Sequence, residues 1–106
     1  MIAVIFEVWP HEDRAQEYFD LAAGLRAELK QVDGFISVER FHSLTTEGKY
    51  VSLSFWRDAA AVKAWFAHAG HRAAQAEGRR SIFKDYRIRV AEVLRDYDMA
   101  AGRPET

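Results

Sequence analysis

The sequence predicts an α+β fold in which four strands and two helices follow one another in the order βαββαβ. Two observations carry this prediction. Stretches rich in Val, Ile and aromatic residues mark strands at residues 2–9, 35–44, 49–56 and 85–97. Apolar residues at spacings of three and four mark helices at residues 11–32 and about 58–76. This order is that of a ferredoxin-like, four-stranded antiparallel sheet.

The first strand, residues 2–9, is followed by Pro10, which cannot donate a hydrogen bond to a sheet and is expected to end the strand. Because side chains alternate along a strand, its residues divide between two faces. One face holds Ile2, Val4, Phe6 and Val8, and the other holds Ala3, Ile5, Glu7 and Trp9. Both faces are largely apolar, so both are expected to be covered.

The first helix is predicted from one apolar stripe, made of Ala15, Tyr18, Leu21, Ala22, Leu25, Leu29 and Val32. Gly24 inside the helix either costs about 1 kcal/mol relative to Ala or marks a close approach of another backbone. Asp33 and Gly34 end the helix, with Gly34 as the left-handed cap.

The second half of the chain repeats this pattern. Residues 45–48 are expected to join two strands as a hairpin, and Asp58 to cap the second helix. The stripe of that helix comprises Val62, Trp65, Phe66, Ala69, Ala73 and Ala76. The last strand, about thirteen residues at 85–97, exceeds the usual strand length and is expected to reach a partner. One domain is therefore predicted at residues 1–97, with a flexible tail at residues 98–106.

Composition limits the possible functions. The 106 residues carry a net charge of −1, so no overall field attracts nucleic acid or anionic lipid. The chain has no cysteine, which excludes disulfides, thiolate zinc sites and a Cys nucleophile. The apolar N-terminus is interrupted by Glu7 and is too short for a signal peptide or a membrane span. A cytoplasmic protein that binds neither nucleic acid nor membrane is expected.

A homodimer is expected from the same patterns. Two helices can cover only one face of a four-stranded sheet, whereas the predicted strands are apolar on both faces. Soluble monomers rarely expose so large an apolar surface. A second copy packed sheet to sheet would cover it.

Several short motifs indicate a family. They are Gly34-Phe35 after the first helix, Ser54-Phe55-Trp56 with Asp58 at the end of a strand, Ala64-Trp65, and His71 with Ala74 and Gln75. In their order and spacing, over residues 1–97, the chain resembles the dimeric α+β barrel superfamily and, within it, the antibiotic biosynthesis monooxygenase (ABM) domain. The resemblance implies homodimers with a pocket between the helices and the sheet of each subunit. It also implies one of three roles: cofactor-independent oxygenation of quinols and aromatic polyketides, haem degradation, or a role not yet known.

Cofactor-free oxygenation needs an apolar cavity, a base for a phenolic proton, and a donor for the developing oxyanion. His71 or Glu7 is the candidate base. Gln75, Trp65 and Tyr50 are candidate donors, and Phe55, Phe66 and Phe83 are candidate aromatic walls. No metal and no organic cofactor are expected, and the expected ligand is a small aromatic molecule.

Each candidate also has a purely structural interpretation. Trp65 lies on the apolar stripe and can be a core residue. Glu7 can pair with Arg87 or Arg89 of the last strand, since a buried carboxylate needs a partner. The basic residues Arg79, Arg80, Lys84, Arg87 and Arg89 can form a solvated face or meet an anionic substrate.

Metal and haem chemistry are less well supported. His68 and His71 lie three residues apart, but no HExxH motif or third zinc ligand accompanies them. In haem-degrading relatives the expected Asn, Trp and His correspond here to Glu7, Trp65 and Gln75, so only the Trp is kept. Gln is a poor iron ligand. The main alternative to an oxygenase is a non-catalytic binding or interaction protein of the same fold. A perturbed acid or base in a sizeable cavity would favour the enzyme.

Overall fold

The computed structural model describes the backbone of residues 1–75 and 81–102, and the side chains of residues 1–68 and 81–102. The elements are β1 (Ile2–Pro10), a 3-10 turn η1 (Glu12–Arg14), α1 (Ala15–Leu29), β2 (Phe35–His42), β3 (Tyr50–Trp56), α2 (Ala59–Gln75) and β4 (Phe83–Glu92). This confirms the predicted ferredoxin-like βαββαβ order. Neither described helix is long and apolar enough to cross a membrane.

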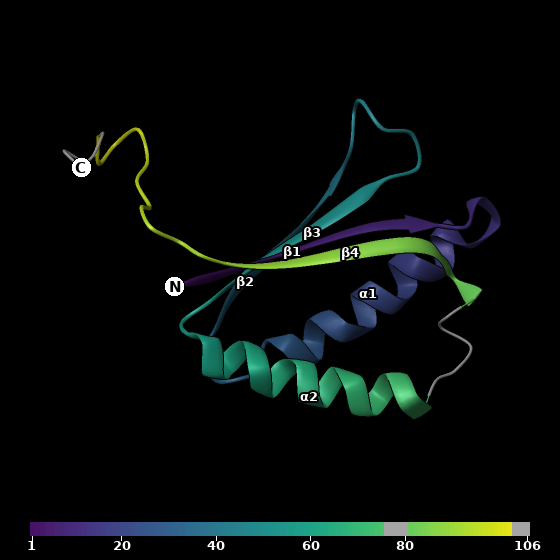
Figure 1. Ribbon diagram of the computed structural model, residues 1–106, viewed down its shortest axis with the longest axis horizontal. Coiled ribbons are helices and arrows are strands. Elements are labelled where there is room, and N and C mark those ends of the chain that lie inside the picture. The colour runs from purple at the N-terminus through teal and green to yellow at the C-terminus, as the bar shows by residue number, and fades with distance from the viewer. Residues whose placement is uncertain (76–80, 103–106) are drawn as a thin grey trace.

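The four strands form one antiparallel sheet in the order β2-β3-β1-β4, and both helices lie on one side of it (Figure 1). β1 is hydrogen-bonded on both sides, whereas β2 and β4 are the edges of this sheet. Val4 pairs with Ser54 of β3 and Val90 of β4, which fixes the register across the three strands. Even-numbered residues of β1, β3 and β4 therefore share the face toward the helices.

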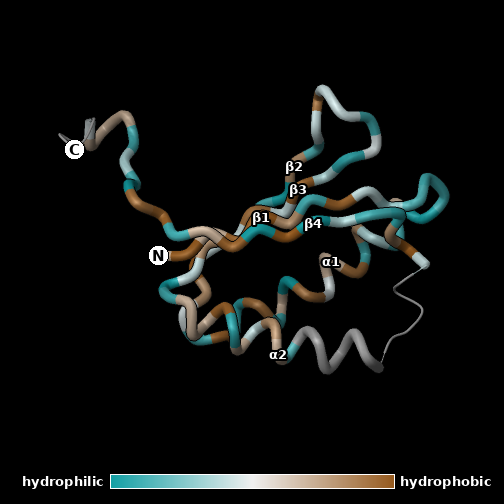
Figure 2. The backbone as a smooth tube through the Cα atoms, viewed as in Figure 1, coloured by the Kyte–Doolittle hydropathy of each residue, from teal (hydrophilic) through white to brown (hydrophobic). Residues whose placement is uncertain are grey.

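The helix side of the sheet holds the core. One cluster joins Val4, Leu29, Trp56, Ala61, Val62 and Trp65, and a second joins Val8, Tyr18 and Ile82. Trp56 is only 1% exposed, and its indole Nε1 donates a hydrogen bond to Ser54 Oγ at 2.9 Å. The buried indole N–H is therefore satisfied, as a buried donor must be. Figure 2 shows hydrophobic segments along β1 and alternating with hydrophilic ones along both helices.

The opposite side of the sheet is covered by neither helix and is here called the open face. It holds the odd-numbered residues of β1 and β3, and Ile5, Val51, Leu53 and Phe55 are half-buried there. Phe41 of β2 is 45% exposed on the same face. The prediction of a sheet that is apolar on both faces holds for β1 and β3, whereas the open face of β4 carries Asp85, Arg87 and Arg89.

The helix predictions need two corrections. The region predicted as the first helix begins with η1, in which Arg14 N donates to His11 O. α1 starts only at Ala15 and ends at Leu29 rather than at residue 32. Phe66 was expected on the buried stripe of α2 but is 39% exposed. Ala61 takes its place because the buried face runs through Ala61, Val62 and Trp65. The proposed cap is confirmed, since Ala61 N donates to Asp58 Oδ1 at 2.9 Å.

The last strand is shorter than predicted. β4 ends at Glu92, which pairs with Ile2, the first residue of β1. One more contact follows, in which Val93 N donates to Met1 O. Residues 93–98 continue without being part of the sheet and lead away from it (Figure 1).

Gly24 and Gly34 differ in whether their backbone conformation and surroundings require glycine. A Cβ added at Gly24 in α1 meets nothing within 4 Å, so no close approach requires glycine there. Gly34 has φ +89°, and an added Cβ would lie 2.6 Å from Ala61 Cβ.

We expect Gly24→Ala to raise the free energy of unfolding by about 1 kcal/mol and Gly34→Ala to lower it by at least as much. Urea denaturation measures both, and a destabilised Gly24→Ala would contradict the assignment.

Candidate functional site

The apolar surface beside the core lies at the β4 edge of the sheet, on the side of the helices. Tyr86, Ile88 and Val90 pair with Val8, Phe6 and Val4, so they share the face toward the helices. Their partners Val8 and Val4 are buried, but Tyr86, Ile88 and Val90 are 56%, 44% and 51% exposed. This β4 apolar row is therefore left uncovered next to a packed core, as expected of a binding surface.

Aromatic rings continue the β4 apolar row toward the other end of the sheet. Phe6 lies 5.8 Å from Tyr86 and 6.0 Å from Phe83, measured between ring centroids. Phe83 in turn contacts Tyr18 in an edge-to-face arrangement at 5.8 Å. Such pairs add to the stabilisation from burial alone. They form a rigid aromatic boundary for one end of the β4 apolar row.

Tyr50 lies on the same side and packs against the same buried cluster, with its ring centroid 6.2 Å from that of Tyr18. Its ring packs edge-on to Phe19 at 5.1 Å and is stacked against His42 at 4.6 Å. Tyr18 is 3% exposed, and its hydroxyl accepts a hydrogen bond from Arg40 Nε at 3.2 Å. Tyr50 is thus part of an aromatic group at the β2–β3 end of the sheet.

Trp65 packs in the core. It is 9% exposed and stacks on Trp56 with ring centroids 6.3 Å apart, and the centroid of the His68 ring lies 5.6 Å from that of Trp65. Val62, one turn earlier, belongs to the same cluster. Core packing accounts for these contacts of Trp65, and His68 itself is exposed.

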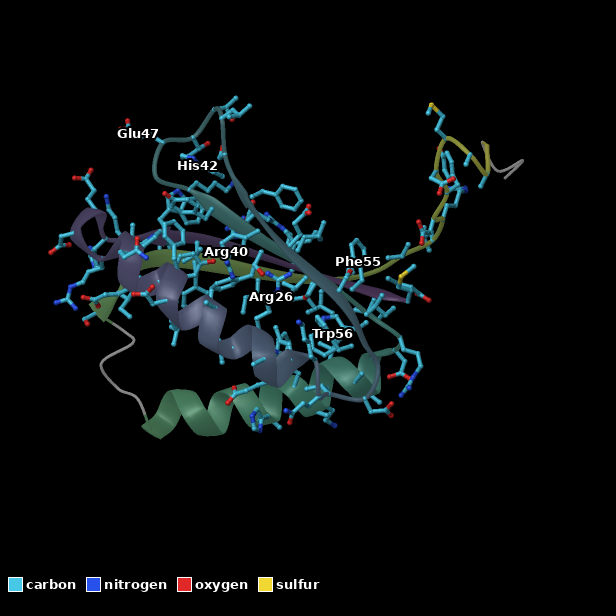
Figure 3. The ribbon with its side chains drawn as sticks, turned by 180° about the vertical axis from the view of Figure 1, so that it is seen from behind. Arg26, Arg40, His42, Glu47, Phe55 and Trp56 are labelled. Carbon is cyan, nitrogen blue, oxygen red and sulfur yellow. The ribbon has the colours of Figure 1, made fainter. Side chains whose placement is uncertain are left out.

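Two of the candidate residues lie on the opposite side from Trp65. Phe55 lies between Ser54 and Trp56, which are buried toward the helices, so its ring is on the open face. Figure 3 shows Phe55 and Trp56 on opposite sides of the strand. Glu7 is also on the open face, because its neighbours Phe6 and Val8 face the helices. Phe55 and Glu7 therefore cannot line the same cavity as Trp65 within one chain.

Glu7 of β1 forms two ion pairs, one with the residue before β3 and one with β4. Its Oε1 lies 2.9 Å from Lys49 Nζ, and its Oε2 accepts a hydrogen bond from Arg89 Nη1 at 2.6 Å. Lys49 Nζ also lies 5.2 Å from the Trp9 ring centroid, a cation–π distance. The hydrogen bond from Lys49, followed by the nearby charges of Lys49 and Arg89, lowers the pKa of Glu7. A carboxylate held ionised in this way is a weak base.

The side chains of His71 and Gln75 lie outside the described residues, as do Arg79 and Arg80. α2 carries the backbone of residues 71 and 75 through its last turns. Among the described side chains, no group of three His, Asp or Glu residues could hold a metal ion.

Tyr86 was not among the residues predicted to form the site. The signal was present, because residues 86–90 alternate Tyr-Arg-Ile-Arg-Val, and alternation places Tyr86 with Ile88 and Val90. Its phenol is a hydrogen-bond donor beside apolar side chains. It can therefore hold a substrate oxygen on the helix side of the sheet.

A comparison with protein families matches this arrangement. The family model described as antibiotic biosynthesis monooxygenase matches residues 1–77. The chain belongs to the ABM family. Among curated ABM-like relatives, "Jasmonate monooxygenase ABM" of Pyricularia oryzae is 43% identical over 93 residues, covering 88% of this chain and 43% of the relative. "Uncharacterized protein YqjZ" of Bacillus subtilis is 34% identical over 62 residues, covering 58% of this chain and 53% of the relative. The chain thus spans about half the length of these relatives.

Solved structures share the fold of this ABM chain. SnoaB of Streptomyces nogalater, described as a cofactor-independent oxygenase, has a TM-score of 0.73 and 17% identity, covering 90% of this chain and 94% of that one. Rv0793 of Mycobacterium tuberculosis has a TM-score of 0.76 and 18% identity, covering 92% and 98%. At this identity the likeness concerns the fold alone.

The ion pairs of Glu7 predict a pH-dependent stability. A carboxylate whose folded pKa lies below its ordinary value of 4.5 stabilises the fold above that pH. The contribution is lost as the pH falls through the folded pKa. We expect Glu7→Gln to lower the free energy of unfolding at pH 7 and to differ less from the wild type near pH 3. Urea denaturation at matched protein concentrations measures this, with Glu47→Gln in the exposed hairpin as the control. A difference that stays constant with pH would contradict it.

Proposed function

We propose that this ABM-family chain is a cofactor-independent monooxygenase that oxidises a small aromatic or quinol substrate on the β4 apolar row. The observation that carries the proposal is the row itself: three apolar side chains that face the helices remain about half exposed. The family and the oxygenase names of a curated relative and a structural neighbour support the reaction class.

The reaction asks little of the protein. A base takes the phenolic proton, and the electron-rich carbon of the anion forms a bond to O₂. For a substrate CH₂ group, cleavage of the O–O bond leaves one oxygen on carbon as a carbonyl and releases the other as water. The four electrons lost by carbon are those that O₂ gains, so O₂ is the only oxidant required.

We assign the base to His71 on α2, because an imidazole exchanges protons near neutral pH. Glu7 is the poorer candidate, since it is ion-paired on the open face and its pKa is lowered. Gln75, one helical turn from His71, and Tyr86 are the proposed donors to the substrate oxygen. Phe83 forms a wall, and Phe66 lies on the exposed side of α2 near Trp65.

A second candidate function is binding without catalysis. The observation that favours it is the packing of Trp65, whose ring is stacked on Trp56 in the core instead of being free for a substrate. In that case the β4 apolar row would bind a small apolar molecule and release it without chemical change.

The oxygenase proposal predicts oxygen uptake by metal-stripped protein. The substrates are a panel of anthrols and hydroquinones, with jasmonate included because of the name of the Pyricularia relative. We expect His71→Ala to lower the rate about 10²–10⁴-fold, as general-base loss does. An oxygen electrode measures the rate, and product mass shows the added oxygen.

The control is His68→Ala, which removes an exposed imidazole one turn earlier on the same helix. It should leave the rate unchanged. Full activity of His71→Ala would remove that residue from the mechanism. Saturable binding of a panel compound to the wild type without oxygen uptake would favour the binding protein.

We further propose that the chain is a homodimer through the open face, which no helix covers and which carries half-buried apolar side chains. A stable interface of this kind buries more than about 2,000 Å² in total. We expect light scattering at micromolar concentration to give twice the chain mass of 12.2 kDa. Leu53→Asp, at the centre of this face, should shift the mass to that of the monomer, whereas Leu44→Asp in the 98% exposed hairpin position should not. A wild-type monomer would contradict the dimer.

A further inference from the structure

A groove of about 430 Å³ lies between α1 and β2, at the edge of the sheet opposite β4. Its lining residues are Arg26, Lys30, Phe35, Ile36, Ser37 and Val38. Figure 3 shows Arg26 between α1 and the sheet. β1 and β3 separate this α1–β2 groove from β4, so it is a different surface from the β4 apolar row. Sites for small molecules have volumes of about 300–1,000 Å³, a range that includes this groove.

One wall of the α1–β2 groove is apolar and fixed by the core. The Phe35 ring packs edge-on to Trp56 with ring centroids 5.3 Å apart, and Phe35 and Val38 both pack against the buried cluster that contains Trp56. The register of β2 with β3 shifts between Phe35 and Ser37, and Ile36, at this shift, is 53% exposed. Irregularities of this kind often re-aim side chains beside binding sites. Here the shift adds an exposed apolar side chain to a wall that is otherwise held in place.

The other wall carries two cations that no described ion pair engages. Arg26 and Lys30 lie four residues apart at the end of α1, so they share one flank of the helix. The ion pairs among the described residues involve neither of them. Asp33, in the turn that leads to β2, is paired with Arg57 at 3.1 Å instead. Like charges at this spacing repel each other, so an anion placed between them removes a destabilising interaction.

We propose that the α1–β2 groove binds a small organic monocarboxylate, with its carboxylate between Arg26 and Lys30 and its apolar body on the opposite wall. This site is independent of the oxygenase reaction and of the dimer proposed above. A guanidinium can donate two parallel hydrogen bonds to a carboxylate, and an ammonium adds a compact positive charge. Because β2 is an edge strand, its outward backbone N–H groups are further donors.

The two walls together select this class of ligand. A cationic molecule is repelled by Arg26 and Lys30. A neutral apolar molecule covers the two cations without pairing them, which costs free energy. A phosphate dianion pairs with the cations but brings a second charge toward Phe35 and Ile36, where losing its water is costly. A carboxylate joined to a hydrocarbon body satisfies both walls with a single charge.

Amide chemical shifts of the isotope-labelled full chain test the site directly. The probes are phenylbutyrate, phenylbutanol as its neutral counterpart, and acetate as the head group alone. We expect phenylbutyrate to give saturable shifts at residues 30 and 35–38. Phenylbutanol and acetate should each bind at least about tenfold more weakly, because one lacks the charge-assisted hydrogen bonds and the other lacks the apolar contact.

Arg26→Gln with Lys30→Gln removes the two charges of the groove and keeps polar side chains. We expect this double variant to raise the Kd of phenylbutyrate about tenfold, the scale of a lost charge-assisted hydrogen bond, and to leave that of phenylbutanol unchanged. The control is Arg14→Gln with Lys63→Gln, which removes the same charge outside the groove and should change neither value. Thermal unfolding without ligand checks that both double variants are folded.

Four results would overturn the site. They are an unchanged Kd of phenylbutyrate in Arg26→Gln with Lys30→Gln, equal binding of phenylbutyrate and phenylbutanol, shifts confined to residues 86–90, and no saturable shift up to about 10 mM phenylbutyrate. Shifts at residues 86–90 would place the acid on the β4 apolar row instead. None of these results depends on oxygen uptake, so the failure of this site leaves the oxygenase proposal to its own test.

Discussion

β1 is hydrogen-bonded on both sides and has apolar side chains on both faces. This constrains the rest of the molecule, because the chain supplies helices for only one face. α1 and α2 bury Val4 and Val8 on that face. On the other face Ile5 remains half-buried beside Leu53 of β3, with no helix above them. The period of two along one central strand therefore separates a core from the open face, which no described helix covers.

Much of the fold follows from local sequence signals. Asp58 caps α2 through the N–H of Ala61, as predicted. Gly34 has a positive φ of +89° but is not the predicted cap of the first helix, because α1 ends at Leu29 with the right-handed Lys30 as its C-cap and Gly34 lies in the turn before β2. The end of β4 could not be predicted in this way. No Pro or Gly lies near Glu92, and the residue with which it pairs, Ile2 of β1, lies ninety positions earlier in the chain. Strand ends depend on their partners, and the pairing is not visible in local composition.

The candidate site was predictable in part. Tyr50 and Phe55 were grouped as pocket residues, although their odd separation of five positions along one strand puts them on opposite faces. The same rule would have found Tyr86. The partner of Glu7 was only half predictable, because Arg89 lies on a strand of suitable alternation, but Lys49 is brought close by the diagonal register of β3. Contacts that depend on register across two strands need the structure.

The open face and the β4 apolar row lie on opposite sides of the sheet, so different residues determine each surface. Odd-numbered residues of β1 and β3 can change the open face without touching the β4 apolar row, and Tyr86, Ile88 and Val90 can change without touching the open face. On the open face, the ion pairs of Glu7 connect β1 to Lys49, just before β3, and to Arg89 of β4. A second copy that covers this face removes water from these charges, which strengthens the paired state and makes any unpaired charge costly. Glu7, Lys49 and Arg89 belong to one chain, so their ion pairs form without a second copy, and the proposed dimer would only shield them from water.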